Sequence, residues 1–274
     1  MLEPGIQDED LELLLSDVLE YHGYDFTAYA KASLKRRVSR LMALDRIPSA
    51  VELRYKIRHD KGYLVRFVEE LTVNVTEMFR DHAFYRAMRE HILPVLATYP
   101  LIRIWHAGCA TGEEVYSMAI LLKESNLLHK TLLYATDINP DVLAKASEGI
   151  FKMQHIRAAA EGYVASGGAA SLSDYYTAHY EHVIMDATLR RRMIFSTHNL
   201  VSDHSFNEFQ LILCRNVLIY FEKDLQDRAC RLFDDSLEPL GYLALGAKET
   251  LRFTSVAKNY VQQDGQRIWR KMKR

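Results

Sequence analysis

The chain has 274 residues, of which 49% are hydrophobic and 26% are charged, and its formal net charge is −1. This length allows a sizeable buried core, and we expect two domains. A net charge this close to zero gives no overall attraction to nucleic acid or to an anionic membrane surface, so we expect neither as a partner.

Three further features predict a cytoplasmic protein. The first residues do not form a secretory signal, and no apolar run approaches the roughly 20 residues that cross a bilayer, so we expect no membrane insertion. The three cysteines, Cys109, Cys214 and Cys230, are an odd number without CxxC spacing, which is typical of free thiols in a reducing compartment. No carboxylate or cysteine completes a convincing metal-ligand set around His179 and His182, so we expect no metal.

From about residue 8 to residue 97 the apolar residues recur at helical spacing. We predict an N-terminal helical domain over residues 1–85 and a linker helix over residues 86–100. One of the predicted helices carries five basic residues opposite an apolar side: Lys31, Lys35, Arg36, Arg37 and Arg40. Such a face is either solvated or docks an acidic partner.

After residue 101 short apolar runs alternate with helical stretches, which predicts an α/β domain with a parallel sheet over residues 101–274. The predicted strands lie near residues 102–106, 132–136, 193–197, 210–214, 242–246 and 268–272. We expect the last two to form an antiparallel hairpin at the sheet edge. Period-two alternation between Tyr176 and Ile184 indicates a strand pair, and we interpret residues 151–197 as an inserted β-subdomain.

The loop after the first predicted strand is a candidate cofactor site. Gly108 and its small neighbours let a ligand approach the backbone, and the next strand ends in Asp137, whose carboxylate can accept both hydroxyls of a ribose. The spacing from Gly108 to Asp137 is longer than in a dinucleotide fingerprint, and Glu113 and Glu114 at the helix start disfavour a pyrophosphate. A cationic nucleoside without phosphates is therefore favoured, and S-adenosylmethionine (SAM) is one.

Two later segments also place polar residues after predicted strands. Asn199 and Leu200 follow the strand near residues 193–197, and Arg215 and Asn216 lie inside an apolar run near residue 214. Open α/β sheets bind their ligands at such strand ends. We therefore expect Arg215 and Asn216 to lie at a ligand site.

Four motifs resemble the CheR chemoreceptor methyltransferases. Residues 71–81 resemble the TNxTxFFR signature of that family, residues 108–117 its STGEEPYS loop, residues 135–138 its ASDI and residues 214–221 its CRNVxIYF. Three departures are visible: Val115 in place of Pro, Met78 in place of Phe, and Gly-Ala-Lys-Glu at residues 246–249 in place of GHSE.

The resemblance implies an all-α N-terminal domain followed by a Rossmann-like class I SAM-dependent methyltransferase domain, with an inserted antiparallel β-subdomain of three strands. It also implies roles for individual residues. The cofactor contacts expected from the resemblance and from the loop are Asn74, Thr76, Arg80, Gly108, Glu114, Asp137, Asn199, Leu200, Arg215 and Asn216. The catalytic residues are expected to be Arg80 and Arg215, which would orient the acceptor, and Tyr220, which would close its pocket.

The activity implied by the resemblance is methyl transfer from SAM to glutamate carboxylates of chemoreceptors, giving methyl esters and S-adenosylhomocysteine (SAH). The basic residues Lys35, Arg36, Arg37 and Arg40 would then dock the acidic helical region of the receptor. Whether the β-subdomain also binds a receptor C-terminal peptide stays open, and we expect a monomer. Two alternatives stay open too: a methyltransferase of the same fold acting on another protein or a small molecule, and a non-catalytic regulator that binds SAM.

Overall fold

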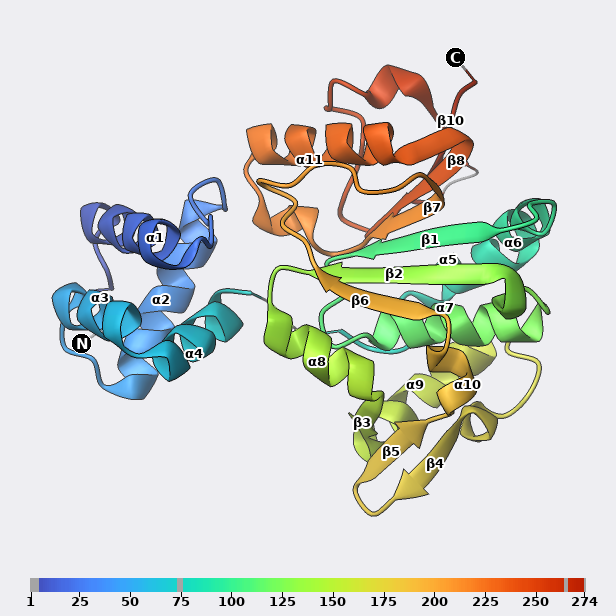
Figure 1. Ribbon diagram of the computed structural model, residues 1–274, viewed down its shortest axis with the longest axis horizontal. Coiled ribbons are helices and arrows are strands. Elements are labelled where there is room, and N and C mark those ends of the chain that lie inside the picture. Colours follow the sequence, from blue (N-terminus) through green and yellow to red (C-terminus); the bar gives the residue numbers. More distant parts are fainter. Residues whose placement is uncertain (1–4, 73–75, 264–265, 274) are drawn as a thin grey trace. The chain divides into compact units, whose positions relative to one another are not determined.

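The structure is a computed structural model that describes residues 5–72, 76–263 and 266–273. The chain divides into two compact units, each with its own hydrophobic core (Figure 1). The first unit is Met1–Asn74 together with Ile219–Ala229, and the second is Val75–Leu218 together with Cys230–Arg274. Within the described residues, no helix is both long and apolar enough to cross a membrane.

The first unit is built from four helices: α1 (Asp8–His22), α2 (Lys31–Asp45), α3 (Ala50–His59) and α4 (Lys61–Leu71). Their apolar residues meet in one core, in which Leu14, Val18, Val38 and Phe67 are fully buried. Each such side chain contributes about 1.5–3 kcal/mol to folding. The all-α prediction for this part of the chain is confirmed.

Local signals set the ends of these helices. Acidic residues fill the first turn of α1, where they complement the helix dipole. Gly23 then ends that helix in the left-handed conformation, at φ 76°, and its N–H donates to the carbonyl of Leu19. At the start of α3, the Ser49 side chain accepts a hydrogen bond from the N–H of Glu52.

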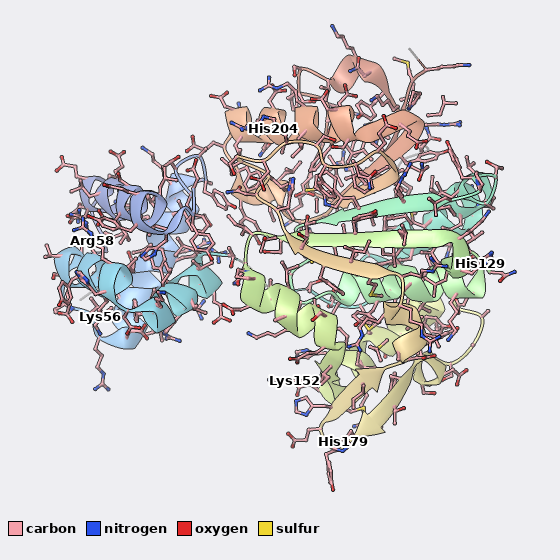
Figure 2. The ribbon with its side chains drawn as sticks, in the orientation of Figure 1. Lys56, Arg58, His129, Lys152, His179 and His204 are labelled. Atoms are coloured by element: carbon pink, nitrogen blue, oxygen red, sulfur yellow. The ribbon has the colours of Figure 1, made fainter. Side chains whose placement is uncertain are left out.

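A buried carboxylate joins α1 to α3. Asp17 exposes 5% of its side chain and accepts hydrogen bonds from Arg54 Nε at 2.5 Å and from Arg58 Nη2 at 2.5 Å. Arg58, labelled on α3 in Figure 2, also lies over the ring of Tyr21, at 4.8 Å. Burial would raise the pKa of Asp17, but the two arginines outweigh burial and hold that pKa below its ordinary value.

The second unit is built on a seven-stranded sheet in the order β6-β2-β1-β7-β8-β10-β9. Pairing is parallel from β6 to β8 and antiparallel between β8 and β10 and between β10 and β9. The strands are β1 (Ile102–Ala107), β2 (Thr131–Asp137), β6 (Met193–Thr197), β7 (Phe209–Cys214), β8 (Leu237–Leu245), β9 (Tyr260–Gln262) and β10 (Ile268–Lys271). All six strands predicted for this sheet are present.

The predicted edge hairpin needs one correction. β10 is antiparallel to β8 as expected, but the strand at the edge of the sheet is β9, which the sequence pattern did not predict. β9 has three residues, too few for a period-two pattern to show. The hairpin at the edge therefore joins β9 to β10.

Helices cover both faces of this sheet (Figure 1). On one side, the α7 residues Tyr116 and Ile120 share a core with Ile104 of β1. On the other side, Phe233 of α11 packs its ring against Trp105, with the ring centroids 5.5 Å apart. The helical segments with residues in this unit are α5 (His82–Ala87), the π-helix η1 (Met88–Ile92), α6 (Leu93–Leu96), α7 (Glu113–Glu124), η2 (Leu128–Lys130), α8 (Pro140–Glu148), α9 (Met153–Ala165), η3 (Leu172–Tyr175), α10 (Ala187–Arg190), η4 (Leu218–Tyr220), α11 (Lys223–Ser236) and η5 (Ala257–Asn259).

The β-subdomain is a separate antiparallel sheet in the order β3-β5-β4, made of β3 (Ile150–Lys152), β4 (Tyr176–His179) and β5 (His182–Met185). Figure 2 labels Lys152 and His179 on it. Glu124 at the end of α7 ties this region to α7 and η1, because it accepts hydrogen bonds from the Tyr163 and Tyr175 hydroxyls and pairs with Arg89 at 2.5 Å. The three-stranded insertion is confirmed, while the domain boundaries drawn from the sequence stay predictions.

The Asp17 cluster leads to the first testable prediction. Asp17→Asn should lower the free energy of unfolding of the helical unit by about 2–3 kcal/mol, because two arginines lose a buried partner. This decrease in the free energy of unfolding is smaller than that for breaking a fully buried ion pair, because water still reaches both arginines. The measurement is urea denaturation followed by far-ultraviolet circular dichroism, since both tryptophans, Trp105 and Trp269, lie in the second unit.

The control is Glu12→Gln, which breaks the exposed pair with Lys31 and should leave the free energy of unfolding nearly unchanged. The contribution of Asp17 depends on its charged form. The difference in the free energy of unfolding between wild type and Asp17→Asn should therefore be present at neutral pH and disappear as the pH falls through the lowered pKa of Asp17. If Asp17→Asn and Glu12→Gln changed the free energy of unfolding equally, Asp17 would not be the stabilising partner of the two arginines.

Candidate functional site

The candidate site lies at the carboxyl ends of the parallel strands of the second unit. β1 pairs with β2 on one side and with β7 on the other, so the chain crosses from one half of the sheet to the other at β1. The arrowheads of β1 and β2 point to the same edge (Figure 1). Open α/β sheets bind ligands at this switch point.

The loop after β1 passes very close to the turn after β7. Gly108 has a φ of 75°, and a Cβ at this position would lie 2.5 Å from Cγ2 of Val217. The N–H groups of Gly108 and Cys109 donate to the carbonyl of Thr136, at 2.8 and 2.9 Å. Glycine is therefore required here, because the absence of a Cβ lets the loop after β1 pack against Val217.

Asp137 holds the loops that follow β1 and β2. Its Oδ2 accepts from the N–H of Ala110 at 2.9 Å, and its Oδ1 accepts from the N–H of Asn139 at 3.0 Å. Burial raises the pKa of Asp137, against the opposing effect of these backbone donors. A carboxylate oxygen has two lone pairs, so both oxygens can still accept a ribose hydroxyl.

Glu114 and Arg215 form a buried ion pair behind this loop. Arg215 Nη1 donates to Glu114 Oε2 at 3.0 Å, and His106 Nδ1 donates to Glu114 Oε1 at 2.9 Å. Burial would raise the pKa of Glu114, but the hydrogen bond from His106 and the charge of Arg215 lower it below its ordinary value. Glu114 is therefore charged at neutral pH.

Arg215 also binds the turn that carries Arg80. Its Nη2 pairs with Asp81 Oδ2 at 2.7 Å and reaches the carbonyl of Arg80 at 3.4 Å, while its guanidinium lies 4.0 Å from the centroid of the Phe84 ring. The Arg215 side chain is only 3% exposed. An acceptor carboxylate could therefore contact Arg215 only if Asp81 or Glu114 moved away.

The turn from Phe79 to Asp81 is strained. Phe79 has a φ of 56° and Asp81 a φ of 59°, a region that residues other than glycine seldom adopt. The N–H of Phe79 donates to Ser117 Oγ at 3.0 Å, and the Phe79 ring is buried against Tyr85 and Tyr163. Both ends of the turn are therefore held in place, and Arg80, in its middle, is partly exposed to solvent.

A second strained turn follows β7. Asn216 has a φ of 62°, and its N–H donates to Glu249 Oε2 at 2.9 Å. The same oxygen accepts from the N–H of Gly246 at 2.6 Å. Glu249 thus joins the ends of β7 and β8 and fixes the backbone beside Arg215.

The loop after β6 contains Asn199 and Leu200. The Asn199 side chain accepts from the N–H of Val201 at 2.9 Å, and its own N–H donates to Asp203 Oδ2 at 2.8 Å. His198, which precedes this pair, donates its backbone N–H to the carbonyl of Asp137, and its ring Nε2 bonds to the carbonyl of His204, the residue labelled in this loop in Figure 2. Leu200 is buried. The loop is therefore tied to the end of β2.

Tyr220 belongs to the first unit. Its carbonyl accepts from the N–H of Ala30, and the Arg37 guanidinium lies 5.5 Å from its ring centroid. Other basic residues of α2 pair with acids of the same unit: Lys35 with Asp8 at 2.5 Å and Arg40 with Glu70 at 3.6 Å. Arg36 is exposed.

The structure therefore brings together Arg80, Gly108, Glu114, Asp137, Arg215 and Asn216 around the ends of β1, β2 and β7. The predicted contact Asn74 lies outside the described residues, and Thr76, just after it, is partly exposed. Sequence reasoning missed Asp81, His106 and Glu249 as partners of this group. Asp81 directly follows Arg80 in the signature motif, and His106 lies only eight residues before its partner Glu114, whereas Glu249 comes next to Asn216 only through the pairing of β7 with β8.

These residues fit a nucleoside without phosphates. Asp137 offers carboxylate oxygens for a ribose, and the carboxylates around Arg215 make the site unattractive for a pyrophosphate. The chemistry of the site thus agrees with SAM as predicted.

Comparison with protein families gives two matches that together cover most of the chain. Residues 74–266 match the family model described as "CheR methyltransferase, SAM binding domain". Residues 9–72 match the one described as "CheR methyltransferase, all-alpha domain". The cofactor is therefore SAM, and the fold class predicted from the sequence is confirmed.

Individual relatives agree with these matches. The chain is 44% identical to the Pseudomonas putida protein Cher3 over 96% of this chain and 97% of that protein. It is 30% identical to "Chemotaxis protein methyltransferase 1" of Pseudomonas aeruginosa over 78% of this chain and 80% of that protein.

Among solved structures, the N-methyltransferase NodS of Bradyrhizobium japonicum in complex with SAH covers 81% of this chain and 97% of its own. Its identity is 12% and its TM-score 0.39, a likeness too low to support any argument. The two family matches, in contrast, span both predicted domains in their expected order. The chain belongs to the CheR methyltransferase family and is a SAM-dependent methyltransferase.

Proposed function

We propose that the chain transfers the methyl group of SAM to glutamate side chains of chemoreceptor-like signalling proteins, in the cytoplasm, for sensory adaptation. The family match and the relatives named as chemotaxis protein methyltransferases support this substrate class. The buried free thiols Cys109, Cys214 and Cys230 are in keeping with a reducing compartment.

One observation carries the proposal. The ion-pair network of Glu114, Arg215 and Asp81 fixes the strained turn of Arg80 beside the loop that would hold the cofactor. A cationic side chain is thereby presented at the same sheet edge as Gly108 and Asp137. This arrangement suits an anionic acceptor that must approach a bound methyl donor.

The chemistry requires alignment more than a base. When bound, SAM supplies an activated methyl group on a sulfonium. A glutamate is already ionised at neutral pH, so one carboxylate oxygen forms the new C–O bond while the S–CH3 bond breaks and its electron pair stays on sulfur. Near-ideal placement of the two reactants lowers such a barrier by about 7–11 kcal/mol.

We assign the roles as follows. Gly108 and Asp137, with Asn199 and Leu200, would line the nucleoside, and Arg80 would orient the acceptor carboxylate. Arg215 is engaged by two carboxylates, so its main task would be to hold Arg80 and Glu114 in place. The pocket-closing role of Tyr220 stays a proposal, as do the remaining predicted cofactor contacts: Asn74, Thr76, Arg80, Glu114, Arg215 and Asn216.

The basic residues of α2 would dock an acidic helix of the receptor. Arg36 is exposed, whereas Lys35, Arg37 and Arg40 contact Asp8, the Glu70 carbonyl and the Glu70 carboxylate within the same unit. These surface pairs contribute little and can exchange for a partner's carboxylates. We expect the enzyme to act as a monomer, and binding of a receptor C-terminal peptide by the β-subdomain stays open.

The cofactor assignment predicts that Asp137→Asn weakens SAH binding by at least about 30-fold. The amide has one acceptor oxygen instead of two, and its NH2 group would face the N–H of Ala110 or of Asn139, which leaves buried donors unpaired. The measurement is calorimetric titration of the purified protein with SAH. The control is Asp141→Asn, four residues further on, which should bind SAH like the wild type; loss of binding in both variants would point to a folding defect.

The acceptor assignment predicts that Arg80→Ala lowers kcat by about 100-fold in a methyl-transfer assay on a chemoreceptor cytoplasmic fragment, because the acceptor loses its orienting cation. The product should be a base-labile methyl ester that releases methanol. Arg191→Ala, an exposed arginine after α10, serves as the control. An Arg80→Ala enzyme with wild-type kcat would remove Arg80 from the catalytic residues.

The docking assignment predicts a salt-dependent effect of Arg36→Glu. We expect KM for the receptor fragment to rise by about fivefold at low salt and the difference to shrink as salt is added, since exposed charges are screened. SAH affinity and kcat should stay close to wild type. The same charge change at Arg191 provides the comparison, and a similar rise in KM there would indicate a general charge effect.

A further inference from the structure

The loop between β8 and β9 displays an aromatic ring to solvent. Phe253 is 91% exposed, while no other phenylalanine among the described residues is more than 43% exposed. A single exposed apolar residue is common on protein surfaces. A fully exposed phenylalanine is worth explaining when its backbone is rigidly held and its neighbours share one charge.

The backbone around Phe253 is rigidly held. Thr254 donates its N–H to the carbonyl of Leu251 at 3.0 Å, and its hydroxyl donates to the same carbonyl at 2.8 Å. Leu251 and Val256, on either side of this turn, are buried. Arg252 and Phe253 are therefore the two central residues of a hydrogen-bonded turn whose ends are anchored in the core.

The same loop is attached to the catalytic edge of the sheet. Glu249, four residues before Phe253, accepts from the N–H groups of Asn216 and Gly246. Four residues of chain span at most about 14 Å, so the Phe253 backbone lies within that distance of the Glu249 backbone.

The charge around Phe253 is of one sign. Residues 246–259 contain three basic residues, Lys248, Arg252 and Lys258, and one acidic residue, Glu249, which is buried. Lys248 and Arg252 are exposed. The loop therefore presents an apolar ring next to Arg252, in a segment whose exposed charges are basic.

We propose that Phe253, with Arg252 and Lys248, is a docking contact for the methyl-accepting helix of the substrate protein. This inference rests on the proposed function. The helix it fits is amphipathic and acidic: a glutamate of the helix lies at Arg80, an apolar residue of the helix covers Phe253, and flanking carboxylates pair with Arg252 and Lys248. A rigid aromatic residue in a basic segment suits such a helix, because the ring supplies buried area with little loss of side-chain entropy.

The test is steady-state methylation of a chemoreceptor cytoplasmic fragment by the full-length enzyme and its Phe253→Ala variant. We expect KM for the fragment to rise by about tenfold, with kcat within about twofold of wild type and SAH affinity unchanged. Tyr55→Ala, which removes another exposed aromatic ring from α3, should leave KM unchanged. Arg252→Glu should also raise KM, and more strongly at low salt.

The outcomes separate this inference from the proposed function. If the wild type methylates the fragment and Phe253→Ala has an unchanged KM, the docking contact is wrong and the proposed function stands. If the wild type binds SAH but methylates no receptor fragment, the proposed function itself fails, and the docking contact fails with it. If sedimentation shows a wild-type dimer that Phe253→Ala converts to a monomer while KM is unchanged, the loop is a contact between two copies of the chain and the inference is overturned.

Discussion

The buried guanidinium of Arg215 is the interaction on which the geometry of the site depends. Taking this charge out of water is unfavourable by several kcal/mol, and burial alone would lower its pKa. The charges of Glu114 and Asp81 reverse that effect and raise the pKa of Arg215, while the Phe84 ring covers its face at 4.0 Å. The Arg215 side chain thereby joins the end of β7 to α7, the helix after β1, and to the turn from Phe79 to Asp81.

The strain in this region follows from the same network. Phe79, Asp81, Ala110 and Asn216 all have positive φ values without being glycine, a conformation that is unfavourable by about 1–3 kcal/mol each. Each of these residues forms a specific hydrogen bond or ion pair that holds it: Phe79 with Ser117, Asp81 with Arg215, Ala110 with Asp137 and Asn216 with Glu249. Strain concentrated on the turns at one sheet edge is typical of a site that is organised before its ligands bind.

Much of the secondary structure, and the candidate cofactor residue Asp137, could be predicted from the sequence because the sequence signals that specify them are local. The helical spacing of the N-terminal residues and the apolar runs of the parallel strands act over a few positions, and the strand predicted at residues 193–197 coincides with β6. Asp137 could be singled out because a carboxylate at a strand end is visible in the sequence. Three-residue β9 could not be predicted, because a period-two pattern needs more residues to be recognised.

The sequence by itself determined the two kinds of domain, the position of most strands, the motifs of the CheR family and hence the cofactor. Only the tertiary structure decided that Arg215 is engaged by Glu114 and Asp81, 101 and 134 residues away, and that Glu249 clamps Asn216. It also decided that residues 219–229 join the first unit, where the N–H of Ala30 meets the carbonyl of Tyr220. The reason is physical: periodicity and turn chemistry act between neighbours in the chain, whereas the pairing of buried charges and backbone groups depends on which segments the sheet brings together.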